Sequence, residues 1–222
     1  MIPPPVRSFL RVNTRKLAKF VRRPMSFPTY PLEVVRYVET IGDDVRYATL
    51  ALAIQRLETD HIEGSFAELG VYKGFTSRFM HRQSPHRRLY LFDTFEGFPS
   101  ASLEVSEDNR FKDTSQEQVA KAIGDDHNVI FRPGFFPQTA VGLEDERFAL
   151  VMLDFDLYKP ALDAFKFFYP LLVRGAYFFL HDFNSPESNH AISRAAREFL
   201  TEKPEQLVEI PDVCGSALFR KI

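Results

Sequence analysis

Short apolar segments alternate along this chain with segments whose apolar residues recur at helical spacing. Five apolar segments have the length of buried strands and lie at residues 64–70, 88–92, 129–132, 148–153 and 177–180. Four segments with helical periodicity lie at residues 75–82, 115–123, 160–172 and 189–201. Two last short segments, 207–209 and 216–221, enclose Pro211 and Gly215 and are typical of paired strands. The alternation predicts an α/β fold with a doubly wound, mostly parallel sheet and a terminal antiparallel hairpin.

A helical stretch over residues 31–57 precedes the first predicted strand. Its second half places apolar residues on one stripe that we expect to be buried: Val45, Ala48, Leu50, Ala53, Ile54 and Leu57. Further along, Pro160 suits the first turn of the 160–172 helix and Gly175 suits the exit from it.

The N-terminal residues differ from the rest of the chain in charge. Residues 1–32 contain seven Lys or Arg and no acid, whereas the whole chain has a net charge of −2, so the remainder carries −9. We therefore divide the chain into a basic N-terminal arm, residues 1–30, and one domain, residues 31–222. Because aromatic anchors are few in the arm and the domain is acidic, we expect the arm to be docked on the domain or partly mobile, rather than bound to a membrane or nucleic acid.

Composition and length are those of one globular domain without a membrane span. The 222 residues are 45% hydrophobic and 26% charged, and no apolar run approaches the roughly 18 residues that a spanning helix needs. The single cysteine, Cys214, excludes an internal disulfide and fits a reducing compartment. Together with a start that lacks the pattern of a signal peptide, this predicts a cytoplasmic protein. The oligomeric state stays open, a homo-oligomer included.

Ionisable residues follow two of the predicted strands. Asp154 and Asp156 come directly after the 148–153 strand, and His181 and Asp182 after the 177–180 strand. Since the carboxyl ends of parallel strands meet at one edge of a sheet, where such folds bind ligands, we expect these four side chains to converge. Carboxylates and imidazole suit a divalent ion, and either group can act as a general base. The alternative is that some of them merely cap strands or helices.

A glycine-containing turn follows the first predicted strand. Gly70 and Gly74 would let a ligand approach the backbone closely, and Glu68 in an apolar strand end needs a polar partner. Asp93 ends the next strand, the place where an acid grips the ribose hydroxyls of a bound nucleoside. Residues 94–114 lack periodicity and predict a long loop of the kind that forms a lid.

Several motifs together resemble the macrocin O-methyltransferases of the TylF type, which methylate sugar hydroxyls of natural products with S-adenosylmethionine. The matching segments are Gly-Ser-Phe-Ala-Glu-Leu-Gly-Val-Tyr-Lys-Gly at 64–74, Phe-Asp-Thr-Phe-Glu-Gly-Phe-Pro at 92–99, Phe-Arg-Pro-Gly-Phe-Phe at 131–136, Leu-Asp-Phe-Asp-Leu-Tyr at 153–158 and Gly-Ala-Tyr-Phe-Phe-Leu-His-Asp-Phe at 175–183. The resemblance covers the chain from about residue 43 to its end, without the arm. It implies a class I methyltransferase-like Rossmann fold.

The resemblance also implies roles for individual residues. Those expected around S-adenosylmethionine are Glu68, Gly70, Tyr72, Gly74, Thr76, Asp93, Phe95, Gly134 and Asp154. Those expected to bind a divalent metal, most simply Mg²⁺ with Mn²⁺ or Zn²⁺ as alternatives, are Asp154, His181 and Asp182. The family has two acids where this chain has His181-Asp182, and the neutral imidazole would favour the softer ions. Asp156 or His181 would take the proton of the acceptor hydroxyl.

Two other functions fit parts of this pattern. An apolar strand followed by Asp154-Phe-Asp156 is also how a metal-dependent nucleotide-sugar glycosyltransferase holds its diphosphate, although the motif comes late in this chain. A non-catalytic module that only binds S-adenosylmethionine would explain His181 as a decayed metal ligand. The small-molecule acceptor would be lined by residues 94–114 and the arm, whose sequences do not identify it.

Overall fold

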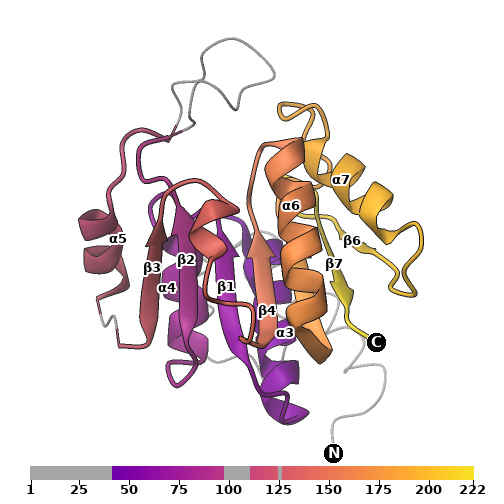
Figure 1. Ribbon diagram of the computed structural model, residues 1–222, viewed down its shortest axis with the longest axis horizontal. Helices are drawn as coiled ribbons and strands as arrows, with labels where there is room; N and C mark the ends of the chain where they lie inside the picture. Colours follow the sequence, from indigo (N-terminus) through magenta and orange to yellow (C-terminus); the bar gives the residue numbers. More distant parts are fainter. Residues whose placement is uncertain (1–41, 98–110, 125–126) are drawn as a thin grey trace, which may run out of the picture.

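The computed structural model describes residues 42–97, 111–124 and 127–222. At its centre is a seven-stranded sheet in the order β3-β2-β1-β4-β5-β7-β6 (Figure 1). The first five strands in this order are parallel, and β7 runs antiparallel to both of its neighbours. The basic arm and residues 98–110 of the predicted lid lie outside the described residues, so both stay predictions.

All seven predicted strands are present, and each lies within about one residue of its predicted bounds except β5, which begins five residues earlier than predicted. Their bounds are β1 Ser65–Leu69, β2 Leu89–Asp93, β3 Val129–Pro133, β4 Phe148–Leu153, β5 Leu172–Leu180, β6 Val208–Ile210 and β7 Ser216–Arg220. Every residue of β1 and of β4 is buried. Burial on both faces explains why β4 is an unbroken apolar run, because a strand with one solvent face would alternate.

Helices cover both faces of the sheet. Their bounds are α3 Asp44–Thr59, α4 Phe75–Gln83, α5 Gln116–Ile123, α6 Tyr158–Phe168 and α7 Ala191–Leu200, with 3₁₀ turns at Gln138–Ala140 and Tyr169–Leu171. One hydrophobic cluster joins α6 and α7 to the sheet, and a second joins α3, α4 and α5 to it. In Figure 1, α6 and α7 lie in front of the strands and α3 and α4 behind them. The doubly wound architecture and the terminal hairpin are confirmed.

The prediction for the segment between β4 and β5 was partly wrong. The helix begins at Tyr158 rather than Pro160 and ends at Phe168, because Pro170 cannot continue an α-helix. Gly175 lies inside β5 and not at a helix exit. It has φ +89°, and a Cβ there would come within 2.9 Å of Ile62 Cδ1. The pairing of β5 with β4 shifts register around this glycine, so Gly175 marks a bulge that the helical pattern concealed.

The buried stripe of α3 was predicted correctly except at its start. Ala48, Leu50 and the later apolar residues are buried, but Val45 is 40% exposed. Arg46 and Tyr47 face the interior instead, with Tyr47 1% exposed. Because the first turn is rotated in this way, the guanidinium of Arg46 lies at the same end of the sheet as Asp154 and Asp182.

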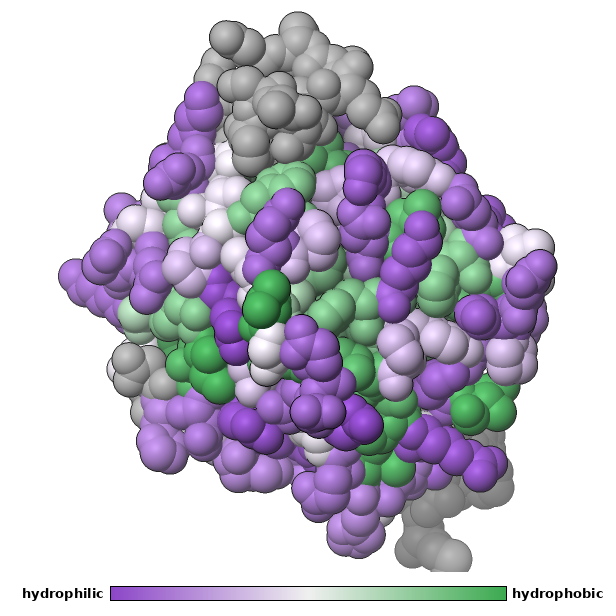
Figure 2. Space-filling view, in the orientation of Figure 1, coloured by the Kyte–Doolittle hydropathy of each residue, from purple (hydrophilic) through white to green (hydrophobic). Residues whose placement is uncertain are grey.

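Apolar residues on the surface are dispersed. Large exposed side chains include Phe75, Val141 and Val213, which lie far apart in the chain, and the face in Figure 2 shows hydrophobic residues interspersed with hydrophilic ones. None of the helices in the described part of the chain has the length and apolar character needed to cross a membrane.

Candidate active site

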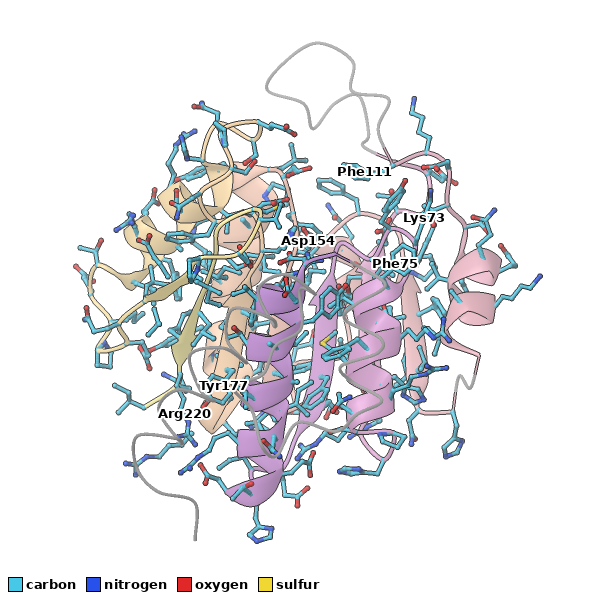
Figure 3. All side chains as sticks on the ribbon, turned by 180° about the vertical axis from the view of Figure 1, so that it is seen from behind. Lys73, Phe75, Phe111, Asp154, Tyr177 and Arg220 are labelled. Atoms are coloured by element: carbon cyan, nitrogen blue, oxygen red, sulfur yellow. The ribbon has the colours of Figure 1, made fainter. Side chains whose placement is uncertain are left out.

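A pocket of about 300 Å³ opens at the carboxyl ends of the parallel strands. It collects residues that follow β1, β2, β3, β4 and β5 together with residues of α3 and α4. Figure 3 shows Lys73, Phe75, Phe111 and Asp154 at this end of the sheet, and Tyr177 toward the opposite end. This is where the strand-end rule for α/β sheets places a ligand.

Most of the residues predicted from the sequence line this pocket. They are Glu68, Gly70, Tyr72, Thr76, Asp93, Gly134, Asp154, Asp156, His181 and Asp182. Gly74 and Phe95 are not among the lining residues. Gly74 caps α4 in the left-handed conformation and its Cα faces Val119, whose Cγ1 would lie 2.8 Å from an added Cβ. Phe95 is buried and packs against Phe131, with ring centroids 6.0 Å apart.

Gly70 brings the backbone after β1 against the backbone after β4. It has φ +87°, and a Cβ at this position would lie 2.2 Å from the carbonyl oxygen of Asp154. The amide of Asp154 in turn donates to the carbonyl of Leu69 at 2.8 Å. No side chain fits between these two strand ends, so the sequence requires glycine here.

Asp93 holds the turn that follows β1. Its Oδ2 accepts hydrogen bonds from the amides of Val71 at 2.7 Å and Tyr72 at 2.9 Å, and its Oδ1 accepts from the amide of Phe95 at 2.7 Å. Three of the roughly four acceptor positions of a carboxylate are therefore occupied by the backbone. Asp93 therefore caps this turn, and one acceptor position of its carboxylate is left for a ligand.

Glu68 is an acid enclosed in the sheet. Its side chain lies in β1, is 1% exposed and accepts a short hydrogen bond from the hydroxyl of Ser77 in α4. Burial raises the pKa of Glu68 well above its ordinary value, the Ser77 hydrogen bond opposes this rise, and the carboxylates of Asp154 and Asp93 add to it. Glu68 thus has the partner that a buried acid needs, and it is protonated more readily than an exposed glutamate.

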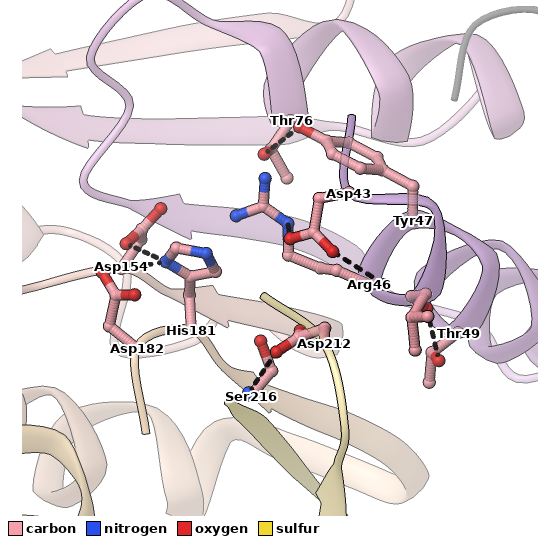
Figure 4. A network of polar contacts seen from close by, with 11 residues as sticks. Asp43, Arg46, Tyr47, Thr49, Thr76, Asp154, His181, Asp182, Asp212 and Ser216 are labelled. Carbon is pink, nitrogen blue, oxygen red and sulfur yellow. Dashed lines mark hydrogen bonds and ion pairs between the residues drawn. The ribbon is translucent and has the colours of Figure 1, made fainter. Parts of the chain in front are cut away.

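His181 lies between two carboxylates (Figure 4). Its Nδ1 is 2.8 Å from Oδ1 of Asp154 and 3.2 Å from Oδ2 of Asp182. Burial alone would lower the pKa of the imidazole, but Asp154, Asp182 and Cys214 outweigh burial and raise the pKa of His181 to about 12. Burial likewise raises the pKa of Asp182, but His181 outweighs it, so the net shift is downward. The predicted convergence of the two strand ends is present.

The donor atoms that could hold a metal differ from the predicted set. Within the described residues, His181, Asp182 and Cys214 form a group whose ligand atoms all lie within 4.8 Å of one another, and Asp154 does not join it. In addition, His181 Nε2 is buried without a hydrogen-bond partner. A donor set of imidazole, carboxylate and thiol suits Zn²⁺ or another borderline ion better than Mg²⁺. Cys214 was missed in the sequence because it lies in the turn of the terminal hairpin, far from every motif.

No role was predicted from the sequence for the aromatic and basic part of the lining, although some of its residues lie within the motifs. It consists of Arg46, Tyr47, Lys73, Phe75, Phe111, Phe135, Phe136 and Phe155. Arg46 and Tyr47 come from α3, where only the apolar stripe was informative. Phe111 packs edge-to-face on Tyr72 at 5.0 Å, and Asp113 binds Lys73 at 2.6 Å and the Tyr72 hydroxyl at 2.8 Å. The end of the predicted lid loop is therefore joined to the turn after β1.

Comparison with known proteins places this site in a family. The model of the family described as Macrocin-O-methyltransferase (TylF) matches residues 34–216, well over half of the chain. The chain belongs to this family. The match includes every strand end that lines the pocket, and the strand order agrees with the class I methyltransferase fold implied by the motifs.

Two curated relatives and one solved structure indicate how close the similarity is. The 8-demethyl-8-(2,3-dimethoxy-alpha-L-rhamnosyl)-tetracenomycin-C 4'-O-methyltransferase of Streptomyces olivaceus is 28% identical over 62% of this chain and 60% of its own length. The mycinamicin III 3''-O-methyltransferase of Micromonospora griseorubida is 25% identical over 66% of each chain. The chain thus spans just under two thirds of these relatives. The structure of the O-methyltransferase NovP has a TM-score of 0.67 at 20% identity, over 80% of each chain, and shares the fold.

Proposed function

We propose that this protein transfers a methyl group from S-adenosylmethionine to a hydroxyl of a sugar, or of another small natural-product acceptor. The observation that supports it most is the pocket at the strand ends, lined by acids, in a chain of the macrocin O-methyltransferase family. Both curated relatives are named as O-methyltransferases, and the name of the first includes a rhamnosyl group. We therefore infer that the acceptor of this protein also carries a sugar.

The cofactor would lie along the ends of β1 and β2. Gly70 leaves the backbone open to the methionine end of the cofactor, next to Glu68 and Thr76. The remaining acceptor position of Asp93 would take a ribose hydroxyl, and Gly134 after β3 would border the adenine. Because Asp93 also fixes the turn beside the cofactor, its role would be to hold both the ligand and the loop that binds it.

Asp156 is the residue we assign as proton acceptor. In the transfer, the bond between sulfur and methyl breaks with its electrons staying on sulfur, a bond forms between the hydroxyl oxygen and the methyl carbon, and the hydroxyl proton must leave. His181 is a poor base at neutral pH, since a pKa of about 12 keeps the imidazole protonated. His181 would instead supply positive charge beside the developing alkoxide. The protein's contribution is then orientation and electrostatics.

We further propose that a divalent ion assists the methyl transfer. His181, Asp182 and Cys214 would hold it, and their mixed donor set favours Zn²⁺ or Mn²⁺ over Mg²⁺. Such an ion would need a deprotonated imidazole, so it would compete with the proton on His181. When bound, it would act as a Lewis acid toward the acceptor hydroxyl.

The test is a methyl-transfer assay with methyl-labelled S-adenosylmethionine and a panel of deoxysugar-bearing natural products. The proposal expects label in at least one acceptor at a hydroxyl oxygen, with Asp156→Asn losing turnover by about 100-fold or more while retaining cofactor affinity. The same assay after chelation, and after addition of Zn²⁺, Mn²⁺ or Mg²⁺, tests the ion separately. Binding of uridine-diphosphate sugar without any binding of S-adenosylmethionine would overturn the proposal in favour of the glycosyltransferase alternative.

A further inference from the structure

Arg46 is a cation in the pocket that neither the motifs nor the proposed chemistry uses. It lies in the first turn of α3, its side chain is 12% exposed, and it lines the pocket with the strand-end acids. Its Nε is 3.2 Å from Oδ2 of Asp43, which precedes the helix. Among the described residues, Nε is buried without a hydrogen-bond partner, and Cζ of the guanidinium lies 4.7 Å from the centre of the Tyr47 ring. A nearly buried guanidinium carries five N–H donors, so this one has donors to spare for a ligand.

Lys73 and His181, the other described cations of the pocket, lie closer to carboxylates than Arg46 does to Asp43. Lys73 is 2.6 Å from Asp113 and its side chain is 41% exposed. His181 lies between Asp154 and Asp182. Among the lining residues that the structure describes, Arg46 is therefore the cation best placed to receive a negatively charged group of a ligand.

Hydroxyl groups and a helix end lie beside Arg46. The hydroxyls of Tyr47 and Thr76 are hydrogen-bonded to each other at 3.0 Å, and Figure 4 shows the guanidinium between this pair and Asp154. Thr76 is the second residue of α4, a nine-residue helix whose first turn contains no acid. The partial positive charge of the helix N-terminus adds to that of Arg46. This part of the pocket is thus suited to an anion.

The opposite wall is acidic. Glu68 and Asp154 line the same pocket, and both lie close enough to Arg46 to interact with it electrostatically. A pocket with a cation on one side and carboxyl groups on the other matches a zwitterion, with its carboxylate toward the guanidinium and its ammonium toward the acids.

We propose that Arg46, with the hydroxyl of Thr76, binds the carboxylate of the methionine part of S-adenosylmethionine. The inference rests on the proposed function, because it takes S-adenosylmethionine as the ligand. The inference assigns a binding partner to the carboxylate, which is the group that distinguishes S-adenosylmethionine from its decarboxylated analogue. A guanidinium binds a carboxylate through two parallel hydrogen bonds, which fixes orientation as well as position. Arg46 would therefore orient the methionine chain and, through it, the methyl group.

The test compares two ligands that differ only in this carboxylate. S-adenosylmethionine and decarboxylated S-adenosylmethionine are titrated calorimetrically into the full-length protein and into Arg46→Met. The wild-type protein should prefer the carboxylated ligand by about 10- to 100-fold, the range of a charge-assisted pair. Arg46→Met should lose that preference by weakening the carboxylated ligand alone. Asp43→Asn is the matched control, because it removes the ion pair with Arg46 but leaves the guanidinium in the pocket, and it should keep the preference.

Each other outcome overturns the inference. If Arg46→Met weakens both ligands equally, or keeps the preference, Arg46 does not bind the carboxylate. The same conclusion follows if the wild-type protein binds both ligands equally. Should Arg46→Met fail to fold, Arg46→Lys provides the comparison, since it keeps the charge without the two-pronged geometry and should retain only part of the preference. A wild-type protein that binds neither ligand would refute the proposed function itself, which distinguishes the two failures.

Discussion

Replacing Asp93 with Ala should affect both the stability of the protein and its affinity for S-adenosylmethionine. The substitution removes three hydrogen bonds, from the amides of Val71, Tyr72 and Phe95, with lengths of 2.7, 2.9 and 2.7 Å. A hydrogen bond to a charged group contributes about 1.5–3 kcal/mol. Because Asp93 is only half-buried, water can replace part of the loss, and we expect about 2–4 kcal/mol of lost unfolding free energy rather than the full sum. For a domain of this size that lowers Tm by about 4–16 °C.

The affinity for the cofactor should fall by about 10- to 100-fold in the same variant, since the turn and the ribose contact are lost together. Thermal unfolding measures the first effect and calorimetric titration the second. Asp93→Asn keeps one acceptor oxygen and should show intermediate values of both. Glu96→Ala is the control, because it removes an equal charge from an exposed side chain in the same loop and should change neither. If Asp93→Ala melts and binds like the wild type, the turn is not held as described.

Three further changes test other parts of the site. Gly70→Ala should lower the free energy of unfolding by at least about 2 kcal/mol, because Gly70 has φ +87° and a Cβ there would lie 2.2 Å from the carbonyl oxygen of Asp154. A melting curve like that of the wild type would contradict this packing. Glu68→Gln should become more stable than the wild type as pH rises above the ordinary glutamate pKa of about 4.3, because the raised pKa of Glu68 means that folding opposes its ionisation. Urea midpoints of both proteins at pH 5 and pH 8 measure this. A difference in midpoint between the two proteins that is the same at both pH values would refute it. The stabilisation by His181 should be complete below its unfolded pKa of about 6.5 and be lost as pH rises toward its folded pKa of about 12. The advantage of wild type over His181→Gln in urea should therefore shrink between pH 6.5 and pH 9.5. An advantage that stays constant over this range would show that the imidazole is neutral in the folded protein.

The sheet and the strand-end residues could be predicted because their signals are local. An apolar run covered on both faces, such as Phe148–Leu153, identifies a buried strand from its own residues. The direction of parallel strands then brings Asp154 and His181 to one edge without further information. The bulge at Gly175 was missed because a glycine between two apolar segments reads equally as the end of a helix.

The basic and sulfur-containing parts of the site could not be predicted in the same way. Arg46 reaches the pocket because the first turn of α3 is rotated so that Val45 faces solvent, and the apolar pattern of that helix suggested the opposite. Cys214 approaches His181 because β7 inserts beside β5. Both contacts depend on how distant elements pack, and a single sequence contains no local signal for them.

Calorimetric titration of the purified protein with S-adenosylmethionine shows directly whether the strand-end pocket binds this cofactor. We expect one bound S-adenosylmethionine per chain, an affinity reduced in Gly70→Ala and Asp93→Ala but not in Glu96→Ala, and no binding of uridine-diphosphate sugar. No heat of binding with S-adenosylmethionine, or binding that Gly70→Ala and Asp93→Ala leave unchanged, would contradict this expectation.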